Sequence, residues 1–171
     1  MKYITGIHGL NIPCSLETCG DWHQSGIQWK KPTIWESEGS ILDEYGIELG
    51  KKIPEHEELY PVANHIRSLL DLLIDAKFGY AQGMNEDFIC VDKYDEEIFQ
   101  KVLLLRTLSH WNDIDYFMCY EYRKKWIEFK KVNNINPILP VKEKLLDKYL
   151  LYMRKEDDEI DFFQDLEAKY K

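Results

Sequence analysis

The helical part of the chain opens with residues 61–75, PVANHIRSLLDLLID. Proline is well tolerated in the first turn of a helix, because its missing N–H would be unpaired there in any case. Apolar residues then recur at helical spacing, which places one set on a single face: Val62, Ile66, Leu69, Leu70 and Leu73. Four polar residues fall away from that face: Arg67, Ser68, Asp71 and Asp75. The pattern predicts an amphipathic helix that begins at Pro61 and buries its leucines.

Further helices are expected downstream. Asp95 can cap one helix, and Asp113 can cap the next. The expected buried positions of these two helices are Ile98, Val102 and Leu105, then Ile114, Met118, Tyr122, Trp126 and Phe129. Pro140 can open another helix, and Glu159–Tyr170 can form a last, acidic one. Between the helix at residues 61–75 and the helix at Asp95, Asp87–Asp92 is expected to be a short strand.

Residues 1–58 are instead rich in Gly, Pro, Trp and Ser. Three runs bounded by Gly or Pro are expected to be strands: Lys2–Ile7, Ile27–Lys30 and Thr33–Glu36. The turn at Lys31-Pro32 is expected to pair the second run with the third. We therefore predict an α+β fold, in which a small N-terminal β-sheet packs on a bundle of about four to five helices. Residues 1–171 are expected to form a single domain, with a strand-rich part (1–58) and a helical part (59–171).

Composition indicates a globular, acidic protein. Hydrophobic residues make up 44% of the 171 residues and the net charge is −9, so a normal core is possible and nucleic acid is a disfavoured partner. No apolar run is long enough to cross a membrane, and no signal-peptide core follows Met1. The four cysteines are too scattered for a disulfide framework. We expect reduced thiols and a cytoplasmic location, and no motif indicates a cofactor.

Residues 8–37 gather the most reactive side chains, and three interpretations stay open. Cys14, Cys19 and His23 could bind zinc with His8 as a fourth ligand, although the spacing is not that of a standard zinc knuckle. Alternatively, Cys19 or an Asp21–His23 pair could be catalytic, since a carboxylate can orient an imidazole as a general base. In the third interpretation this stretch is structural, with Cys14 buried and three tryptophans packing the sheet: Trp22, Trp29 and Trp35.

Two other segments carry charged groups of interest. Residues 83–87, GMNED, could hold a divalent cation, but capping of the following segment explains Asn85 and Asp87 more simply. Residues 120–131 interleave basic and aromatic side chains, which is a pattern that can bind nucleic acid. The helical stripe already assigns the aromatic residues of that segment to the core. The acidic residues 156–159 could pair with its basic face.

Three stretches in the N-terminal third are KYITG (2–6), LNIPC (10–14) and CGDWH (19–23). Together they resemble the opening of small uncharacterised bacterial proteins from abortive-infection and toxin–antitoxin neighbourhoods. The resemblance extends into ANHIR (63–67). It implies a role in bacterial defence and brings no active-site motif with it.

These features lead us to expect a protein-binding inhibitor of antitoxin or immunity type, whose acidic surface binds a basic partner protein. The expected contact residues are Asp21, Trp22, His23, Trp35, Glu36 and Glu38. One alternative is an enzyme, such as the toxin itself, that uses the Cys14–His23 loop with Glu36 or Glu86. The other alternative is a nucleic-acid binder that works through Arg123–Lys131.

Overall fold

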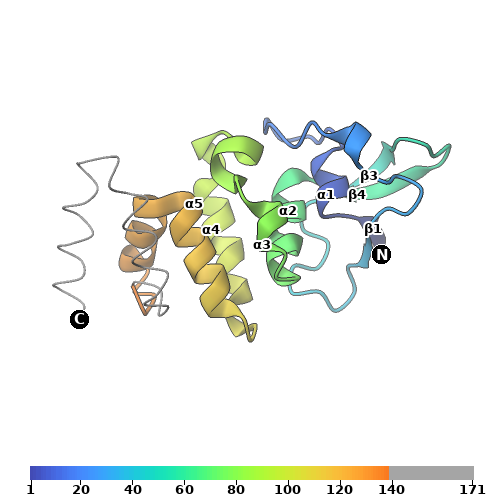
Figure 1. Cartoon of the computed structure of the whole chain (residues 1–171). Coiled ribbons are helices and arrows are strands. Elements are labelled where there is room, and N and C mark those ends of the chain that lie inside the picture. The colour runs from blue at the N-terminus through green and yellow to red at the C-terminus, as the bar shows by residue number, and fades with distance from the viewer. Residues whose placement is uncertain (139–171) are drawn as a thin grey trace. The chain divides into compact units, whose positions relative to one another are not determined.

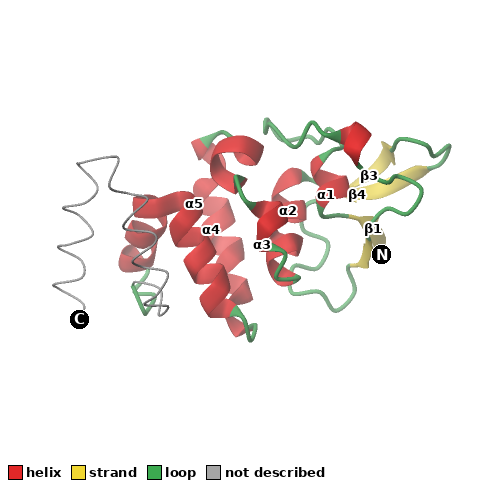
Figure 2. Ribbon diagram, viewed as in Figure 1, coloured by secondary structure: helices red, strands yellow, loops and turns green. Residues whose placement is uncertain are grey.

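The computed structural model of the chain describes residues 1–138 (Figures 1 and 2). The chain divides into two compact units, Met1–Trp111 and Asn112–Lys171. The first unit holds a four-stranded sheet and most of the helices, and the second is entered by a long helix. The α+β fold with an N-terminal sheet is confirmed. The helices expected after Pro140 and at Glu159–Tyr170, and the acidic residues 156–159, lie outside the described residues.

The sheet consists of four short strands in the order β2-β1-β4-β3. The strands are β1 (Lys2–Ile4), β2 (Ile34–Glu36), β3 (Ile47–Lys52) and β4 (Leu59–Ala63). β1 runs antiparallel to β2 and parallel to β4, and β3 runs antiparallel to β4. β2 and β3 are therefore the edges of the sheet.

Two of the expected strands are confirmed in part, and one is wrong. β1 ends at Ile4 rather than Ile7, because Gly6 adopts a positive φ of 63° and starts the short helix α1 (Ile7–Leu10). β2 pairs with β1, opposing Trp35 to Tyr3. Residues 27–30 form no strand, and the buried Trp29 instead donates its indole N–H to the carbonyl of Gln24 at 3.0 Å.

The main helix does not begin at Pro61 as expected, because residues 59–63 form strand β4. Pro61 lies inside this central strand, where a missing N–H would normally break the hydrogen-bonded ladder. The register between β3 and β4 shifts between Glu48 and Lys51, opposite this proline, and Gly50 there has a φ of 72°. The bulge in β3 removes the need for an N–H on Pro61, which explains how a proline is accommodated in this strand.

Helix α2 (His65–Ile74) begins after Asn64, whose side chain accepts a hydrogen bond from the N–H of Arg67 at 2.8 Å. The expected leucine face is buried. However, Arg67, Ser68 and Asp71 are buried as well, so the prediction that they lie away from the core is wrong. α2 is therefore covered on both faces within the first unit.

A buried hydrogen-bond network explains these polar positions. Arg67, which has 0% exposure, donates from Nε to Asp71 at 2.8 Å and from Nη2 to the hydroxyl of Tyr3 at 2.6 Å. The hydroxyls of Tyr3 and Thr5 in turn donate to the other carboxylate oxygen of Asp71, at 2.9 and 2.6 Å. Burial raises the pKa of Asp71, against the opposing effect of the Arg67 charge.

The same guanidinium holds the loop that connects β2 to β3. Its Nη1 donates to the carbonyls of Asp43 and Tyr45, each at 2.9 Å, and to that of Leu42 at 3.3 Å. Its Nη2 also donates to the Ser40 hydroxyl at 3.1 Å. One side chain thus ties α2, the first strand and this loop together.

The remaining elements of the first unit are short. They are η1 (Gln24–Gly26), α3 (Phe78–Ala81), η2 (Met84–Ile89), η3 (Asp92–Tyr94), α4 (Asp95–Leu104) and η4 (Leu105–Thr107). The strand expected at Asp87–Asp92 is wrong. Gly83 and Cys90, which flank η2, both have a positive φ, at 90° and 52°, and residues 84–89 between them form a π-helical turn. The expected helix is confirmed as α4, although Asp95 is its first residue and the capping position is Tyr94.

In the second unit, helix α5 (Trp111–Val132) has non-helical backbone angles at Arg123. All five residues of its expected apolar stripe are buried: Ile114, Met118, Tyr122, Trp126 and Phe129. Lys130 is also buried and donates to Asp115 at 2.7 Å, beside the indole N–H of Trp126, which donates to the same oxygen at 2.8 Å. This lysine is therefore not part of an exposed basic face. Among the helices within residues 1–138, none combines the length and apolar character that a bilayer crossing requires.

Replacing Arg67 by Met should strongly destabilise the protein. The change leaves Asp71 buried without its cation and leaves loop carbonyls without a donor, which typically costs about 3–5 kcal/mol. The measurement is the free energy of unfolding in urea, followed by tryptophan fluorescence. The exposed Arg106→Met variant is the matched control and should stay within about 0.5 kcal/mol of the parent. Equal stabilities of the two variants would contradict the central role assigned to this network.

Candidate active site at the start of helix α2

The first residue of α2 contacts the loop that follows α1. His65 is buried, and its Nδ1 lies 2.7 Å from the hydroxyl of Thr18. Its Nε2 lies 3.1 Å from the carbonyl oxygen of Ile12. Both ring nitrogens are therefore engaged by residues that are distant from His65 in the sequence.

Gly20 presses on the same imidazole ring. A Cβ atom at this position would lie 2.8 Å from Nε2 of His65 and closer still to its Cε1, so no larger residue fits without displacing the ring. The φ of 68° at Gly20 is also one that glycine adopts at little cost. The backbone around it is held by hydrogen bonds from Gly20 to Phe88 and from Asp21 to Leu10, each at 2.8 Å. The ring is thus positioned by packing as well as by hydrogen bonds.

The Cys14 thiol completes the group. It is half-buried, and its Sγ lies 3.7 Å from the hydroxyl of Thr18. Burial by itself raises the pKa of this thiol. The neighbouring His65 and the N–H of Leu16 outweigh burial, and together they lower the pKa to about 7. A free cysteine has a pKa of about 8.5, so Cys14 carries far more thiolate at neutral pH than an ordinary cysteine.

The hydrogen-bond partners define the direction of proton movement. A carbonyl oxygen can only accept, so Nε2 of a neutral His65 carries the proton that points to Ile12. Nδ1 then accepts a hydrogen bond from the Thr18 hydroxyl. The oxygen of that hydroxyl can in turn accept a hydrogen bond from the Cys14 thiol. A proton can therefore pass from Cys14 through Thr18 to His65, leaving a thiolate and an imidazolium.

Polar contacts hold the loop that carries Cys14. Ser15 donates from its N–H and its hydroxyl to Glu48 on β3, at 2.8 and 2.6 Å. Lys51 of the same strand donates to the carbonyl of Pro13 at 3.0 Å and pairs with Glu48 at 2.6 Å. At the other end of the loop, Glu17 pairs with Lys93. The thiol is thus carried by a loop anchored to the sheet and to η3.

A disulfide joins Cys19 to Cys90, and both residues are exposed. The expectation that all four cysteines are reduced thiols is therefore wrong for these two. Cys14 and Cys119 are not part of a disulfide, and Cys119 is buried in the second unit. Cys19 directly follows Thr18, and Cys90 directly follows η2. The bond therefore holds the loop that carries Cys14 and Thr18 close to η2. Its exposure leaves it accessible to reductants.

The zinc interpretation does not hold for the residues it invoked. Cys19 is in the disulfide, and His8 accepts from the N–H of Thr33 at 3.2 Å, with its Nε2 3.3 Å from the carbonyl of Gln28. His23 contacts Asp21 instead of a cysteine. Within residues 1–138, no group of three or more His, Cys, Asp or Glu side chains is placed to hold a metal ion, and that includes residues 83–87.

The expected partner-binding residues fall into two segments. Asp21, Trp22 and His23 are consecutive, and Asp21 contacts the imidazole of His23, as the pairing hypothesis expected. The side chain of His23 is 86% exposed and Trp22 is 80% exposed, so Trp22 does not pack the sheet. The second segment is the edge strand β2 and the turn after it, where Glu36 and Glu38 are exposed and Trp35 is half-buried.

Sequence reasoning missed His65, which it treated as one residue of an amphipathic helix. It also treated Cys14 as a buried apolar residue, whereas the thiol is half-exposed and faces polar groups. Glu36 and Glu86, offered as catalytic partners, are exposed residues of β2 and η2. The stretches 10–14, 19–23 and 63–67 that carry the resemblance do meet here, at His65.

Comparison of this chain with models of protein families, with curated proteins and with solved structures gives no match. The resemblance to proteins of defence neighbourhoods therefore stays a prediction.

The Cys14 thiol should react with iodoacetamide along a pH profile whose midpoint is near 7, because the thiolate is the reactive form. His65→Gln should move that midpoint up toward about 8.5 and slow the reaction at neutral pH about tenfold. The measurement is the alkylation rate by intact-mass and peptide analysis, without reductant, so that the disulfide persists. Burial raises the pKa of Cys119, which should react slowly in the native protein.

His23→Gln is the matched control, because His23 is exposed and contacts Asp21 rather than a cysteine. Its alkylation profile should coincide with that of the parent. If the two histidine variants gave the same profile, the activation assigned to His65 would be wrong.

Proposed function

We propose that this chain is an enzyme of acyl transfer or hydrolysis that uses Cys14 as its nucleophile. The observation that supports this best is the relay from the Cys14 thiol through Thr18 to His65, with a pKa for Cys14 of about 7. A nucleophile within reach of a base, with the base held by a third group, is the arrangement that nucleophilic catalysis requires. Here the Ile12 carbonyl and Gly20 are the groups that hold the imidazole.

The reaction would proceed in two steps. The Cys14 thiolate attacks a carbonyl carbon and forms a C–S bond, and the leaving group departs with the proton that His65 received. His65 then takes a proton from water, the resulting hydroxide attacks the thioester, and the C–S bond breaks to release a carboxylic acid. The proton returns to the thiolate, so the free enzyme is regenerated.

The N–H groups of His65 and Leu16 stabilise the thiolate between turnovers, since both lower the pKa of Cys14. His65 is the first residue of α2, where the N–H groups have no partner within the helix. The partial positive charge of a helix N-terminus acts in the same direction. This explains why the thiol, although half-buried, has a lowered rather than a raised pKa.

The first test is hydrolysis of p-nitrophenyl acetate, a small activated ester, over many equivalents. Cys14→Ser should abolish turnover, and His65→Gln should reduce it by about 100-fold, the usual effect of losing a general base. The intact mass of the His65→Gln protein should show an acetyl group retained on Cys14. His23→Gln should hydrolyse the ester as fast as the parent.

Full hydrolysis by Cys14→Ser would overturn the proposal. So would a single acetylation of the parent protein without turnover, because that outcome describes a reactive thiol and not an enzyme. The urea midpoint of each variant, measured in parallel, separates loss of catalysis from loss of folding.

A second candidate function is the protein-binding inhibitor that acts in bacterial defence on a basic partner. The observation that favours it is the exposure of Trp22, at 80%, between Asp21 and the exposed His23. Large exposed aromatic residues are preferred anchors of protein interfaces. The net charge of −9 would attract a basic partner and speed its association.

Trp22→Ala should abolish capture of a stoichiometric, basic protein by the immobilised full chain from its native host. Leu49→Ala is the matched control, since Leu49 is an apolar residue of β3 with 68% exposure. Association measured with the purified partner should slow as salt is added. Equal capture by both variants would rule out the proposed interface at Trp22. An association rate that does not respond to salt would rule out steering by charge.

A further inference from the structure

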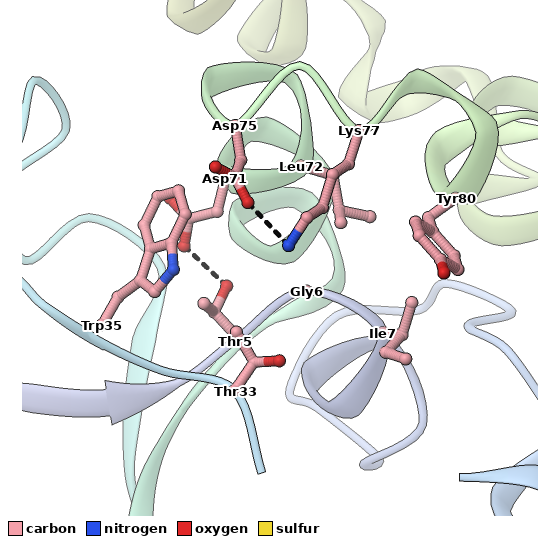
Figure 3. A pocket seen from close by; sticks show the side chains of 10 residues that line it. All are labelled: Thr5, Gly6, Ile7, Thr33, Trp35, Asp71, Leu72, Asp75, Lys77 and Tyr80. Atoms are coloured by element: carbon pink, nitrogen blue, oxygen red, sulfur yellow. Dashed lines mark hydrogen bonds and ion pairs between the residues drawn. The ribbon is translucent and has the colours of Figure 1, made fainter.

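A small pocket lies at the opposite end of α2 from Cys14 (Figure 3). Its volume is about 150 Å³, and its wall includes the end of β1, strand β2 and the residues that follow α2. α2 has ten residues and is therefore roughly 15 Å long. The pocket is thus separate from the thiol site, and an inference about it does not depend on the chemistry proposed for Cys14.

Carboxylates and aromatic rings dominate the functional groups of this pocket. Asp71 and Asp75 contribute the carboxylates, and Trp35 and Tyr80 contribute the rings. Figure 3 shows the two rings on opposite sides of the pocket, with Lys77 between them directed toward Asp75. Aromatic faces attract cations, and Arg guanidinium groups stack on them.

The pocket already receives one cation from the chain itself. Lys77 pairs with Asp75 at 2.7 Å, and both side chains are about half-exposed. The end of α2 brings this lysine into place, since Lys77 and Ala76 donate to the carbonyls of Leu72 and Leu73 at 2.8 and 3.1 Å. An exposed pair of this kind is weak, so a better-fitting cation can displace Lys77.

The two acids differ in what they can offer a ligand. The charge of Asp71 is already matched by Arg67 on its buried side, and its second oxygen accepts from Tyr3 and Thr5. Asp75 has only the exposed Lys77 as its ion-pair partner among the described residues. Asp75 is therefore the acid that a ligand would engage, and the hydroxyl oxygens of Thr5 and Thr33 in the wall add acceptors.

We infer that this pocket binds a guanidinium group, held by Asp75 and stacked on Trp35, in place of the Lys77 ammonium. A flat guanidinium matches a carboxylate through two parallel N–H donors and an aromatic face through its plane, whereas an ammonium offers a point charge. The group can come from an arginine side chain of a protein or from a free small molecule. Both sources share this chemistry, and Trp35 is also one of the expected partner-binding residues.

The test follows the indole N–H resonance of Trp35 by NMR, assigned with Trp35→Phe, during titration with two probes. The probes are agmatine and the tripeptide Ala-Arg-Ala blocked at both ends, and urea serves as the neutral control of the same shape. Both guanidinium probes should shift the resonance, and urea should not. Tighter binding of the tripeptide would identify a protein arginine as the ligand, and tighter binding of agmatine would identify a small molecule.

Two substitutions should act in opposite directions. Asp75→Asn should weaken the binding of agmatine about fivefold or more. Lys77→Met should strengthen that binding, because the competing cation is removed. Glu57→Gln and Lys52→Met are the matched controls, since these residues form another exposed pair, at 3.3 Å. No response of the Trp35 resonance to either guanidinium probe would overturn the inference, as would weaker binding by Lys77→Met or equal effects of Asp75→Asn and Glu57→Gln.

Discussion

The buried Arg67–Asp71 pair is the constraint on which the first unit depends. A charge at 0% exposure is tolerated only when its hydrogen bonds are satisfied, and Arg67 makes them to Asp71, Tyr3, Ser40 and three loop carbonyls. These partners come from three parts of the first 71 residues: strand β1, the loop between β2 and β3, and α2 itself. The pair therefore determines where β1 and the loop between β2 and β3 must lie against α2.

Helix α2 gains its functional importance from this fixation. Its first residue, His65, is held against the loop that carries Cys14, and the residues after its last turn place Lys77 over the pocket. A helix locked at its centre by Arg67 and Asp71 keeps both ends in constant positions relative to the sheet. Such rigidity suits a thiol whose reactivity depends on contacts to Thr18 and His65 within hydrogen-bonding distance.

Local patterns in the sequence were sufficient to locate the three longer helices, α2, α4 and α5, and insufficient for the site. The leucine spacing identified α2, and the stripe through Trp126 identified α5, because period and burial go together along a helix. The start of α2 was predicted wrongly at Pro61. This proline is accommodated in β4 by a bulge in the neighbouring strand β3, and no pattern near Pro61 indicates that bulge. His65 and Thr18 are 47 positions apart, and a pairing over such a distance leaves no pattern in a single sequence.

The two candidate functions share one loop, and the structure indicates how they can be told apart. Thr18 and Gly20 face His65, whereas Trp22 and His23 point to solvent a few positions later. Gly20 is the division between them, since a side chain at this position would clash with the imidazole and with the Leu10 carbonyl. Changes before Gly20 should therefore affect thiol chemistry, and changes after it should affect partner binding. An effect of Trp22 on both would mean that a bound protein covers Cys14, so that inhibition and catalysis would be two states of the same loop.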